Sequence, residues 1–365
     1  MIYLDHAATS FPKPIEVQQA VARWFTDVGV SPHRGDGPAT ADSAATLQRC
    51  REGVARHTGH RPDRVAFCSG ATEGLNLTLR ALTKERSRVV TTPYEHSSVA
   101  RPLTALREER SLQVLRAVTV AQLCGHVEAG DADLVVMTHA SNVIGEVFDA
   151  SAVTSAARNR GVPVILDASQ TAGYVPLDVG ASVVVASAHK ALHGPPGLGF
   201  ISADADTQLA PQKFGGSGTS SAIDRHPTRW PEAYEAGTPN MPALYGLDAA
   251  LQWIAAQQPG ELLRRALAPL RTIKDALDAA PGFTTFHSDR PIAMPVLSLT
   301  HECFDPLELS SILANAGIHA RAGFHCAPWI HDMIGTAAAG TLRLSTGPLT
   351  TSDDADAVIR LLTSL

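Results

Sequence analysis

The sequence lacks the features that mark membrane, secreted and nucleic-acid-binding proteins. It contains no run of about 18 apolar residues, so we expect no membrane span. Basic residues form no block, and the net charge is −6, so nucleic acid is not an expected partner. The first six residues include an acid where a secretory signal would have basic and then apolar residues.

Cysteine is scarce as well. The five cysteines are odd in number and scattered, without a CxxC pair. This pattern indicates reduced thiols and predicts a cytoplasmic location. The 365 residues are 44% hydrophobic and 18% charged and show no internal repeat, which is typical of a globular protein with one large and one smaller domain.

Strand and helix patterns alternate along most of the chain. β-Branched runs cover residues 64–70, 88–92 and 133–139, and helical patterns cover 41–57 and 150–160. The alternation predicts an α/β fold with a mostly parallel sheet. A first helix should begin at Pro14 and bury one apolar face, made of Val17, Val21, Trp24, Phe25 and Val28.

The C-terminal part of the sequence indicates a second, smaller unit. Two helical stretches lead into it, Leu244–Ala256 and Glu261–Ala280, and we take the first as the link. The elements that follow are a strand at Ile292–Thr300, a helix at Asp305–Ala316, a strand at Thr341–Ser345 and a helix at Ser352–Leu365. This order predicts a small α+β or α/β unit.

Two strand-like runs end in residues that carry chemistry. One ends in Asp167, and the other contains Ser187 and is followed by His189 and Lys190. The 23 residues between Asp167 and Lys190 (190 − 167) allow one crossover between parallel strands. An acid and an amine would then face one crevice, where open α/β sheets bind ligands. A carboxylate facing a Schiff-base lysine is what pyridoxal phosphate (PLP) requires, although either residue alone is more simply an ordinary strand-end Asp or a solvated Lys.

Three further signals are weaker. Ala71 and Thr72 begin a helix after a strand, where free backbone N–H groups favour an anion, but Thr could simply cap the helix. His96 could lie over a flat ring or move protons, but a lone histidine is more often a polar loop residue. Asn142 could hydrogen-bond a phenolic oxygen or serve as a turn residue.

The ordered set of motifs resembles a known enzyme family. The chain is similar to the fold-type I PLP enzymes of aminotransferase class V, and within them to the cysteine desulfurase and selenocysteine lyase group. The Arg-x-Gly-x-His-Cys-Ala form resembles the SufS-type branch. The motifs that carry the resemblance are Tyr3-Leu-Asp-His-Ala-Ala-Thr, Ser69-Gly-Ala-Thr-Glu, Glu95-His96, Ser141-Asn142, Asp167-Ala-Ser-Gln170, Ser187-Ala-His-Lys190, Glu235-Ala-Gly-Thr238, Arg321-Ala-Gly-Phe-His-Cys-Ala327 and Thr341-Leu-Arg-Leu-Ser.

The resemblance implies PLP as cofactor and a role for each matching residue. Lys190 would hold the cofactor aldehyde, Asp167 would pair with the ring nitrogen, and His96 would stack on the ring. Thr238 would reach the phosphate of a neighbouring subunit, which implies a homodimer. The phenolic oxygen of the cofactor would lie between Asn142 and Gln170. Its phosphate would be bound by Ala71, Thr72, Ser187 and His189.

The resemblance also implies a substrate grip and a nucleophile. Arg343, with Arg321 nearby, would hold the substrate carboxylate, for which a planar fork of donors is well suited. Cys326 would attack the sulfur of cysteine as a thiolate, favoured by Arg321 and His325, and would pass the resulting persulfide sulfur to an acceptor thiol, with alanine as the other product. A small buried cysteine is the alternative interpretation of Cys326, but its glycine-containing segment flanked by Arg321 and His325 favours the functional role.

Several alternatives stay open at this point. A selenocysteine lyase, or a C–S lyase acting by β-elimination, would share most of these residues. A cofactor-binding scaffold would keep them without turnover. A metal site is a different class, but the spacing of its four candidate ligands matches no standard zinc pattern, and we expect no metal. Those ligands would be His319, His325, Cys326 and His331.

We expect the domains to follow the family arrangement. A large PLP-binding domain would cover residues 15–250, with a mostly parallel sheet of the seven-stranded type. Residues 1–14 and 251–365 would form a smaller α/β C-terminal domain that carries the Cys326 loop and Arg343.

Overall fold

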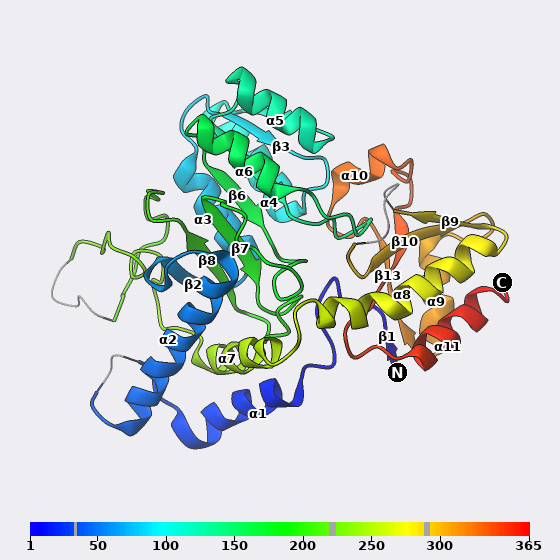
Figure 1. Ribbon diagram of the computed structural model, residues 1–365, viewed down its shortest axis with the longest axis horizontal. Helices are drawn as coiled ribbons and strands as arrows, with labels where there is room; N and C mark the ends of the chain where they lie inside the picture. Colours follow the sequence, from blue (N-terminus) through cyan, green and yellow to red (C-terminus); the bar gives the residue numbers. More distant parts are fainter. Residues whose placement is uncertain (33–34, 219–223, 288–292) are drawn as a thin grey trace.

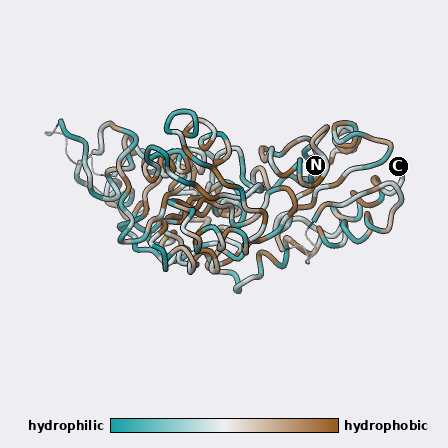
Figure 2. Tube along the Cα trace, turned by 90° about the horizontal axis from the view of Figure 1, so that it is seen from above, coloured by the Kyte–Doolittle hydropathy of each residue, from teal (hydrophilic) through white to brown (hydrophobic). Residues whose placement is uncertain are grey.

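The computed structural model describes residues 1–32, 35–218, 224–287 and 293–365 and has two lobes, each built on its own sheet (Figure 1). Hydrophobic residues gather inside each lobe, and hydrophilic residues lie mainly on the outside (Figure 2). Across these described ranges, none of the helices is long and apolar enough to cross a bilayer.

The large sheet confirms the expected α/β fold. Every neighbouring pair of strands is parallel except the two pairs made by β8, which runs antiparallel to both neighbours. The seven strands lie in the order β2 (Val65–Cys68), β8 (Gly199–Ala203), β7 (Val183–Ser187), β6 (Val164–Asp167), β5 (Leu134–Thr138), β3 (Arg88–Thr91) and β4 (Gln113–Arg116).

Helices cover both faces of this sheet. Side chains alternate along each strand, so Val164 and Leu166 of β6 join one hydrophobic cluster and Ile165 joins the other. The first cluster is covered by α2 (Pro38–Thr58), α5 (Val120–Ala129), α6 (Ala150–Asn159) and α7 (Met241–Ala255). The second cluster is covered by α3 (Ala71–Leu82) and α4 (Ser97–Arg110).

The first helix buries the apolar face expected from the sequence only in part, since Trp24 and Val28 are half-buried against the core of the large lobe. α1 (Ile15–Arg23) buries Val17 but continues into a π-helical turn over Trp24–Val28, which ends at Gly29 in the left-handed conformation. Phe25 is 67% exposed. The wider π-helical turn breaks the 3.6-residue period on which that face depended, so the prediction was wrong for Phe25.

The small sheet is antiparallel throughout, which makes the second unit α+β, one of the two expected alternatives. Its strand order is β12 (Arg321–Gly323), β13 (Thr341–Ser345), β10 (Val296–His301) and β9 (Phe283–Phe286). The sequence pattern missed β9, and Ile292, the expected start of β10, lies outside the described residues. The helices of this lobe are α8 (Glu261–Ala279), α9 (Pro306–Asn315) and α11 (Ser352–Leu362), whereas α10 (Pro328–Met333) packs through Ile330 against the core of the large lobe.

An N-terminal arm of residues 1–14 runs between the two lobes. Its strand β1 (Ile2–Tyr3) pairs in parallel with β11 (Ile318–His319), and Leu4 is part of the core of the small lobe. Further along, the Ser10 N–H donates to the His189 carbonyl in the large lobe at 2.9 Å. The separate core of the small lobe, built from arm and C-terminal residues, supports the expected domain division, which remains a proposal.

Candidate active site

A cavity of about 240 Å³ lies between residues of the large sheet and residues of the small lobe. It brings together most of the residues singled out in the sequence, namely Ala71, Thr72, His96, Asn142, Asp167, Ser187, His189, Lys190, Arg321, Cys326 and Arg343. The lining also includes Ala7, Ala8, Ser98, Ser169 and His325. Gln170 and Thr238 lie elsewhere.

Asp167 and Lys190 reach the cavity because β6 and β7 are parallel neighbours whose carboxyl ends meet at one edge of the sheet. Asp167 ends β6, is 5% exposed, and accepts a hydrogen bond from the Ser169 N–H at 3.0 Å. Burial lowers the pKa of Lys190, and the charge of Asp167 opposes that shift. A lysine whose charged form is disfavoured offers more neutral amine, which Schiff-base chemistry needs.

The start of α3 provides an anion site beside this pair. The helix follows Gly70 and has no side-chain cap, and the Ala71 N–H donates to Ser187 Oγ at 2.9 Å. Thr72 Oγ1 lies 2.7 Å from Ser98 Oγ. The positive end of the helix dipole and a cluster of hydroxyl groups therefore face the same cavity, as a phosphate would require.

His96 caps α4 and faces the cavity as a neutral ring. Its Nδ1 accepts a hydrogen bond from the Ser98 N–H at 3.1 Å, so in the neutral imidazole the proton lies on Nε2. Burial, with a contribution from Lys190, lowers the pKa of His96 to about 4. An uncharged imidazole can lie against a flat ring or exchange a proton through Nε2.

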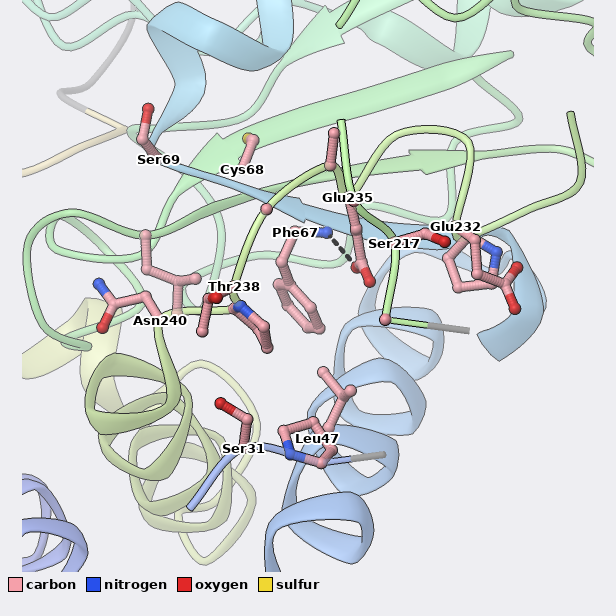
Figure 3. Close-up of a pocket in the computed structure, with 18 of the residues that line it drawn as sticks. Ser31, Leu47, Phe67, Cys68, Ser69, Ser217, Glu232, Glu235, Thr238 and Asn240 are labelled. Atoms are coloured by element: carbon pink, nitrogen blue, oxygen red, sulfur yellow. Dashed lines mark hydrogen bonds between the residues drawn. The ribbon is translucent and has the colours of Figure 1, made fainter. Parts of the chain in front are cut away.

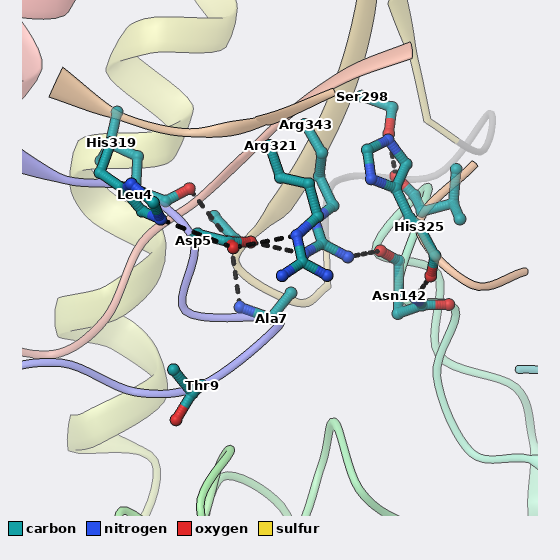
Figure 4. Close-up of polar contacts among 12 residues, drawn as sticks. Leu4, Asp5, Ala7, Thr9, Asn142, Ser298, His319, Arg321, His325 and Arg343 are labelled. Atoms are coloured by element: carbon teal, nitrogen blue, oxygen red, sulfur yellow. Dashed lines mark hydrogen bonds and ion pairs between the residues drawn. The ribbon is translucent and has the colours of Figure 1, made fainter. Parts of the chain in front are cut away.

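Arg343, Arg321 and Asp5 form an ion-pair group on the opposite side of the cavity (Figure 4). Arg343 is 1% exposed; its NH2 lies 2.6 Å from Asp5 Oδ1, and its NH1 donates to the Asn142 carbonyl at 3.1 Å. Arg321 contacts Asp5 Oδ2 through Nε at 3.1 Å. The sequence alone does not predict the contact of Asp5 with Arg343, because nothing local in the sequence connects the two residues.

Cys326 lies on an exposed loop held by its backbone. The Asn142 side chain donates to the His325 carbonyl at 2.7 Å, and the Ser97 N–H donates to the Cys326 carbonyl at 2.6 Å. His325 and Cys326 have φ values of +49° and +55°, a left-handed conformation that non-glycine residues adopt at a cost of about 1 kcal/mol or more. These contacts fix the thiol at the mouth of the cavity.

The expected help of His325 in forming a Cys326 thiolate is not supported. Burial, with a contribution from Arg343, lowers the pKa of His325 to about 2, so its ring is neutral. Its Nε2 contacts Thr341 Oγ1 at 2.9 Å. The positive charges that remain beside Cys326 are those of the two arginines.

Gln170 and Thr238 do not join the other predicted residues. Gln170 Nε2 donates to the Ala7 carbonyl at 2.9 Å and faces a small hollow that Lys190 also lines. Thr238 lines a separate cavity of about 400 Å³, together with Ser69 and Glu73 (Figure 3).

The candidate metal ligands are engaged elsewhere. The His319 ring stacks on Tyr3 with 5.1 Å between ring centroids, and His331 Nδ1 lies 2.7 Å from Thr336 Oγ1. Within the part of the chain that the structure describes, no group of three or more His, Cys, Asp and Glu side chains is arranged to hold a metal ion.

The sequence model of the aminotransferase class-V family matches residues 2–358. The chain belongs to this family. It is 28% identical to a probable cysteine desulfurase of Methanothermobacter thermautotrophicus, over 97% of this chain and 92% of the relative. It is also 28% identical to the cysteine desulfurase CsdA of Escherichia coli, over 98% of this chain and 92% of the relative.

Solved structures agree with the class-V fold. The apo cysteine desulfurase of Thermococcus onnurineus superposes with a TM-score of 0.92 at 24% identity, over 100% of this chain and 94% of that one. The E. coli CsdA structure gives a TM-score of 0.87 at 24% identity, over 99% of this chain and 93% of that one.

The cofactor of class-V enzymes is PLP, and the cavity fits it. An amine with a lowered pKa, a buried carboxylate and an uncapped helix start line one hollow, as the aldehyde, ring nitrogen and phosphate of PLP require.

Proposed function

We propose that this chain is a cysteine desulfurase that converts L-cysteine to L-alanine and takes the sulfur onto Cys326 as a persulfide. One observation carries the proposal: an exposed thiol, Cys326, lines the same cavity as Lys190, Asp167 and Arg343. A transaminase or an epimerase needs no cysteine at that place. The cysteine desulfurases among the relatives support the same reaction.

The large-sheet side of the cavity would hold the cofactor. Lys190 would bind its aldehyde, and Asp167 would keep its ring nitrogen protonated. His96 would lie against the ring, Asn142 would lie beside the phenolic oxygen, and Gln170 would reach that oxygen from the adjoining hollow that Lys190 also lines. The phosphate would be held at the start of α3 and by the hydroxyl and imidazole groups beside it, that is, by Ala71, Thr72, Ser187 and His189.

The substrate would be held by its carboxylate on Arg343, with Arg321 beside it. When bound, PLP supplies an electron sink for the substrate α-carbon, which weakens the bond between Cβ and sulfur. The amine of Lys190, whose charged form is disfavoured by burial, can hold the proton taken from that carbon. The buried surroundings of Arg343 exclude water from its contact with the carboxylate, which strengthens the ion pair.

Cys326 would complete the reaction without an outside oxidant. Its thiolate bonds to the substrate sulfur while the bond between Cβ and sulfur breaks. The carbon fragment gains protons and leaves as alanine, and the sulfur stays on Cys326 as a persulfide. An acceptor thiol, such as that of a partner protein, can then remove the sulfur, and the exposure of Cys326 leaves room for it.

The test is the release of alanine and sulfide from cysteine by the purified protein, with and without a reductant. Cys326→Ala should abolish desulfuration and keep the cofactor absorbance, and Cys303→Ala, which changes another exposed cysteine, should behave as wild type. If Cys326→Ala still releases sulfide from cysteine at the wild-type rate, the protein is a C–S lyase or a selenocysteine lyase acting by elimination, and the persulfide step is wrong.

We further propose a homodimer located in the cytoplasm. Thr238 lies outside the cavity that holds Lys190, in a hollow large enough to receive part of a second subunit, so its expected phosphate contact would be made across subunits. All five cysteines are free, which is typical of a reducing compartment. Light scattering of the purified protein tests the dimer, because a monomer that releases alanine at full rate would contradict it.

A further inference from the structure

The N-terminal arm places a buried carboxylate, Asp5, beside the two arginines of the cavity. The arm is held from both sides, because the Leu4 N–H donates to the His319 carbonyl and the Leu4 carbonyl accepts from the Ser345 N–H, each at 2.8 Å. The Asp5 side chain is 3% exposed. Its position is therefore set by backbone pairing of the arm with β11 and β13 and does not depend on a flexible surface contact.

Asp5 divides its two oxygens between the two arginines (Figure 4). Oδ1 lies 2.6 Å from Arg343 NH2, and Oδ2 lies 3.1 Å from Arg321 Nε. Arg321 and Arg343 are directly opposite each other on β12 and β13, where two like charges would otherwise destabilise the strand pair. One carboxylate thus compensates a repulsion that the sheet register creates.

The same contact fixes the plane of the buried guanidinium. Arg343 is anchored through NH2 on Asp5 and through NH1 on the Asn142 carbonyl. Two anchors on a rigid planar group leave no freedom to rotate. Its Nε is buried and has no hydrogen-bond partner among the described residues, so this donor is not used by the contacts that anchor the group. Burial lowers the pKa of Arg343, and Asp5 is the main opposing influence.

The ion-pair group of Asp5, Arg321 and Arg343 has a net charge of +1. Two arginines and one carboxylate leave a single net positive charge, which matches a ligand with one carboxylate. Without Asp5, the same wall would carry two positive charges and would favour a dianion.

We propose that Asp5 is the positioning residue of the substrate-carboxylate site: it orients Arg343 and sets the net charge of the wall so that a monocarboxylate is preferred to a dianion. This inference rests on the proposed function, since it assigns Arg343 and Arg321 to the substrate carboxylate. Asp5 touches neither the cofactor nor the reacting atoms and acts only through the arginines.

The experiment compares cysteine with inorganic sulfate, a dianion that has neither amine nor thiol. In the PLP-loaded enzyme, Asp5→Asn should raise the KM for cysteine, because the anchor loses its charge, and should lower the inhibition constant of sulfate, because the wall gains net charge. The ratio of the KM for cysteine to the inhibition constant of sulfate should rise at least tenfold, which corresponds to about 1.4 kcal/mol. The value of kcat should change much less than this ratio, and the absorbance of the bound cofactor should stay as in wild type.

His319→Gln is the matched control. His319 Nε2 lies 4.0 Å from Asp5 Oδ2 and the side chain is 54% exposed, so the variant removes a neighbour of Asp5 without touching either arginine. It should keep the wild-type ratio. An Asp5→Asn enzyme with an unchanged ratio overturns the inference. A purely structural loss of stability would not strengthen sulfate binding, so tighter sulfate binding distinguishes the proposed role from a structural one.

The double variant Asp5→Asn with Arg321→Gln tests the charge sum directly. It restores a net charge of one, so sulfate inhibition should return toward the wild-type value, and sulfate binding as tight as in Asp5→Asn would contradict the proposal. If Asp5→Asn does not fold, Arg321→Gln alone serves, because a wall with no net charge should bind sulfate at least tenfold more weakly. A wild-type protein that releases no alanine from cysteine would instead refute the proposed function.

Discussion

The wall of the cavity formed by the large sheet and the wall formed by the small lobe with the N-terminal arm bury their ionisable groups in different ways. In the large-sheet wall, burial shifts Lys190, His96 and His189 toward their neutral forms, with a pKa of about 4 for each histidine. In the other wall, Arg343 is charged and lies 2.6 Å from Asp5, whose charge opposes the lowering of the Arg343 pKa by burial. Burial also keeps His325 of the second wall neutral, so what distinguishes that wall is the ion pair of Arg343 with Asp5.

This difference separates two tasks in one cavity. A neutral amine and neutral imidazoles suit covalent and proton-transfer chemistry, which needs groups that change protonation. A paired, permanently charged arginine suits recognition of a carboxylate, which needs a fixed geometry. Changes in the first wall should therefore affect the cofactor, and changes in the second should affect the substrate.

The largest expected effect is that of Lys190→Ala. Removing the amine should abolish the absorbance of the covalently held cofactor and reduce alanine release from cysteine by roughly a thousandfold or more, because both the attachment point and the proton carrier are lost. Absorbance spectra and single-turnover assays measure the two effects. A variant that retains the wild-type spectrum would show that Lys190 does not hold the cofactor.

Arg343→Lys should have the next largest effect, and of a different kind. An ammonium cannot keep both anchors and present a planar fork to a carboxylate, so the KM for cysteine should rise by roughly a hundredfold, or about 3 kcal/mol. The cofactor spectrum should stay as in wild type. Loss of the bound cofactor in this variant would contradict the separation of the two walls.

The two walls also differ in how far the sequence could predict them. Asp167 and Lys190 follow neighbouring parallel strands, and the ends of such strands meet at one edge, so a local pattern placed them together. Asp5 and Arg343 are 338 residues apart, and no periodicity connects them. The resemblance supplied Arg343 but not its partner, because the pairing follows from how the arm packs on the small sheet.

Other parts of the fold were missed for local reasons. The short strand β9 (Phe283–Phe286) has no buried residue, so it lacks the apolar alternation by which strands are recognised. The π-helical turn after α1 depends on packing that the sequence period does not show. The left-handed conformation of His325 and Cys326 is likewise unusual for these residue types and is held by contacts from Asn142 and Ser97.

Glu95→Gln tests whether the buried carboxyl group beneath the large-sheet wall is neutral in the folded protein. Glu95 is fully buried beneath the wall, its Oε1 accepts from the Thr138 N–H at 3.0 Å, and burial raises its pKa to about 8. Because the folded pKa lies above the unfolded value, the wild type loses stability as pH rises from about 4.5 to 8. The glutamine variant should avoid this loss and gain about 3 kcal/mol relative to wild type at pH 7, when both are measured by urea unfolding.

Glu109→Gln is the control for that measurement. Glu109 lies in a surface ion pair with Arg80, and its side chain is 47% exposed, so solvent screens its charge. Its unfolding free energy should follow the wild-type pH dependence. A Glu95→Gln curve parallel to wild type between pH 4.5 and 8 would show that Glu95 is ionised and the wall is not neutral there.

The smallest expected effect is that of His139→Gln, which tests the stability of the large lobe at acid pH. His139 follows β5, is 5% exposed, and its Nδ1 lies 3.0 Å from Thr171 Oγ1. Burial lowers its pKa to about 4, below the unfolded value of 6.5, so its contribution is fully present above pH 6.5 and is lost as pH falls toward 4. The variant should therefore lose about 2 kcal/mol less than wild type between pH 7 and pH 5. The control is His301→Gln, which changes a partly buried histidine of the small lobe. It should lose as much unfolding free energy as wild type between pH 7 and pH 5. If both variants lose less than wild type by the same amount, acid sensitivity is not a property of the large lobe.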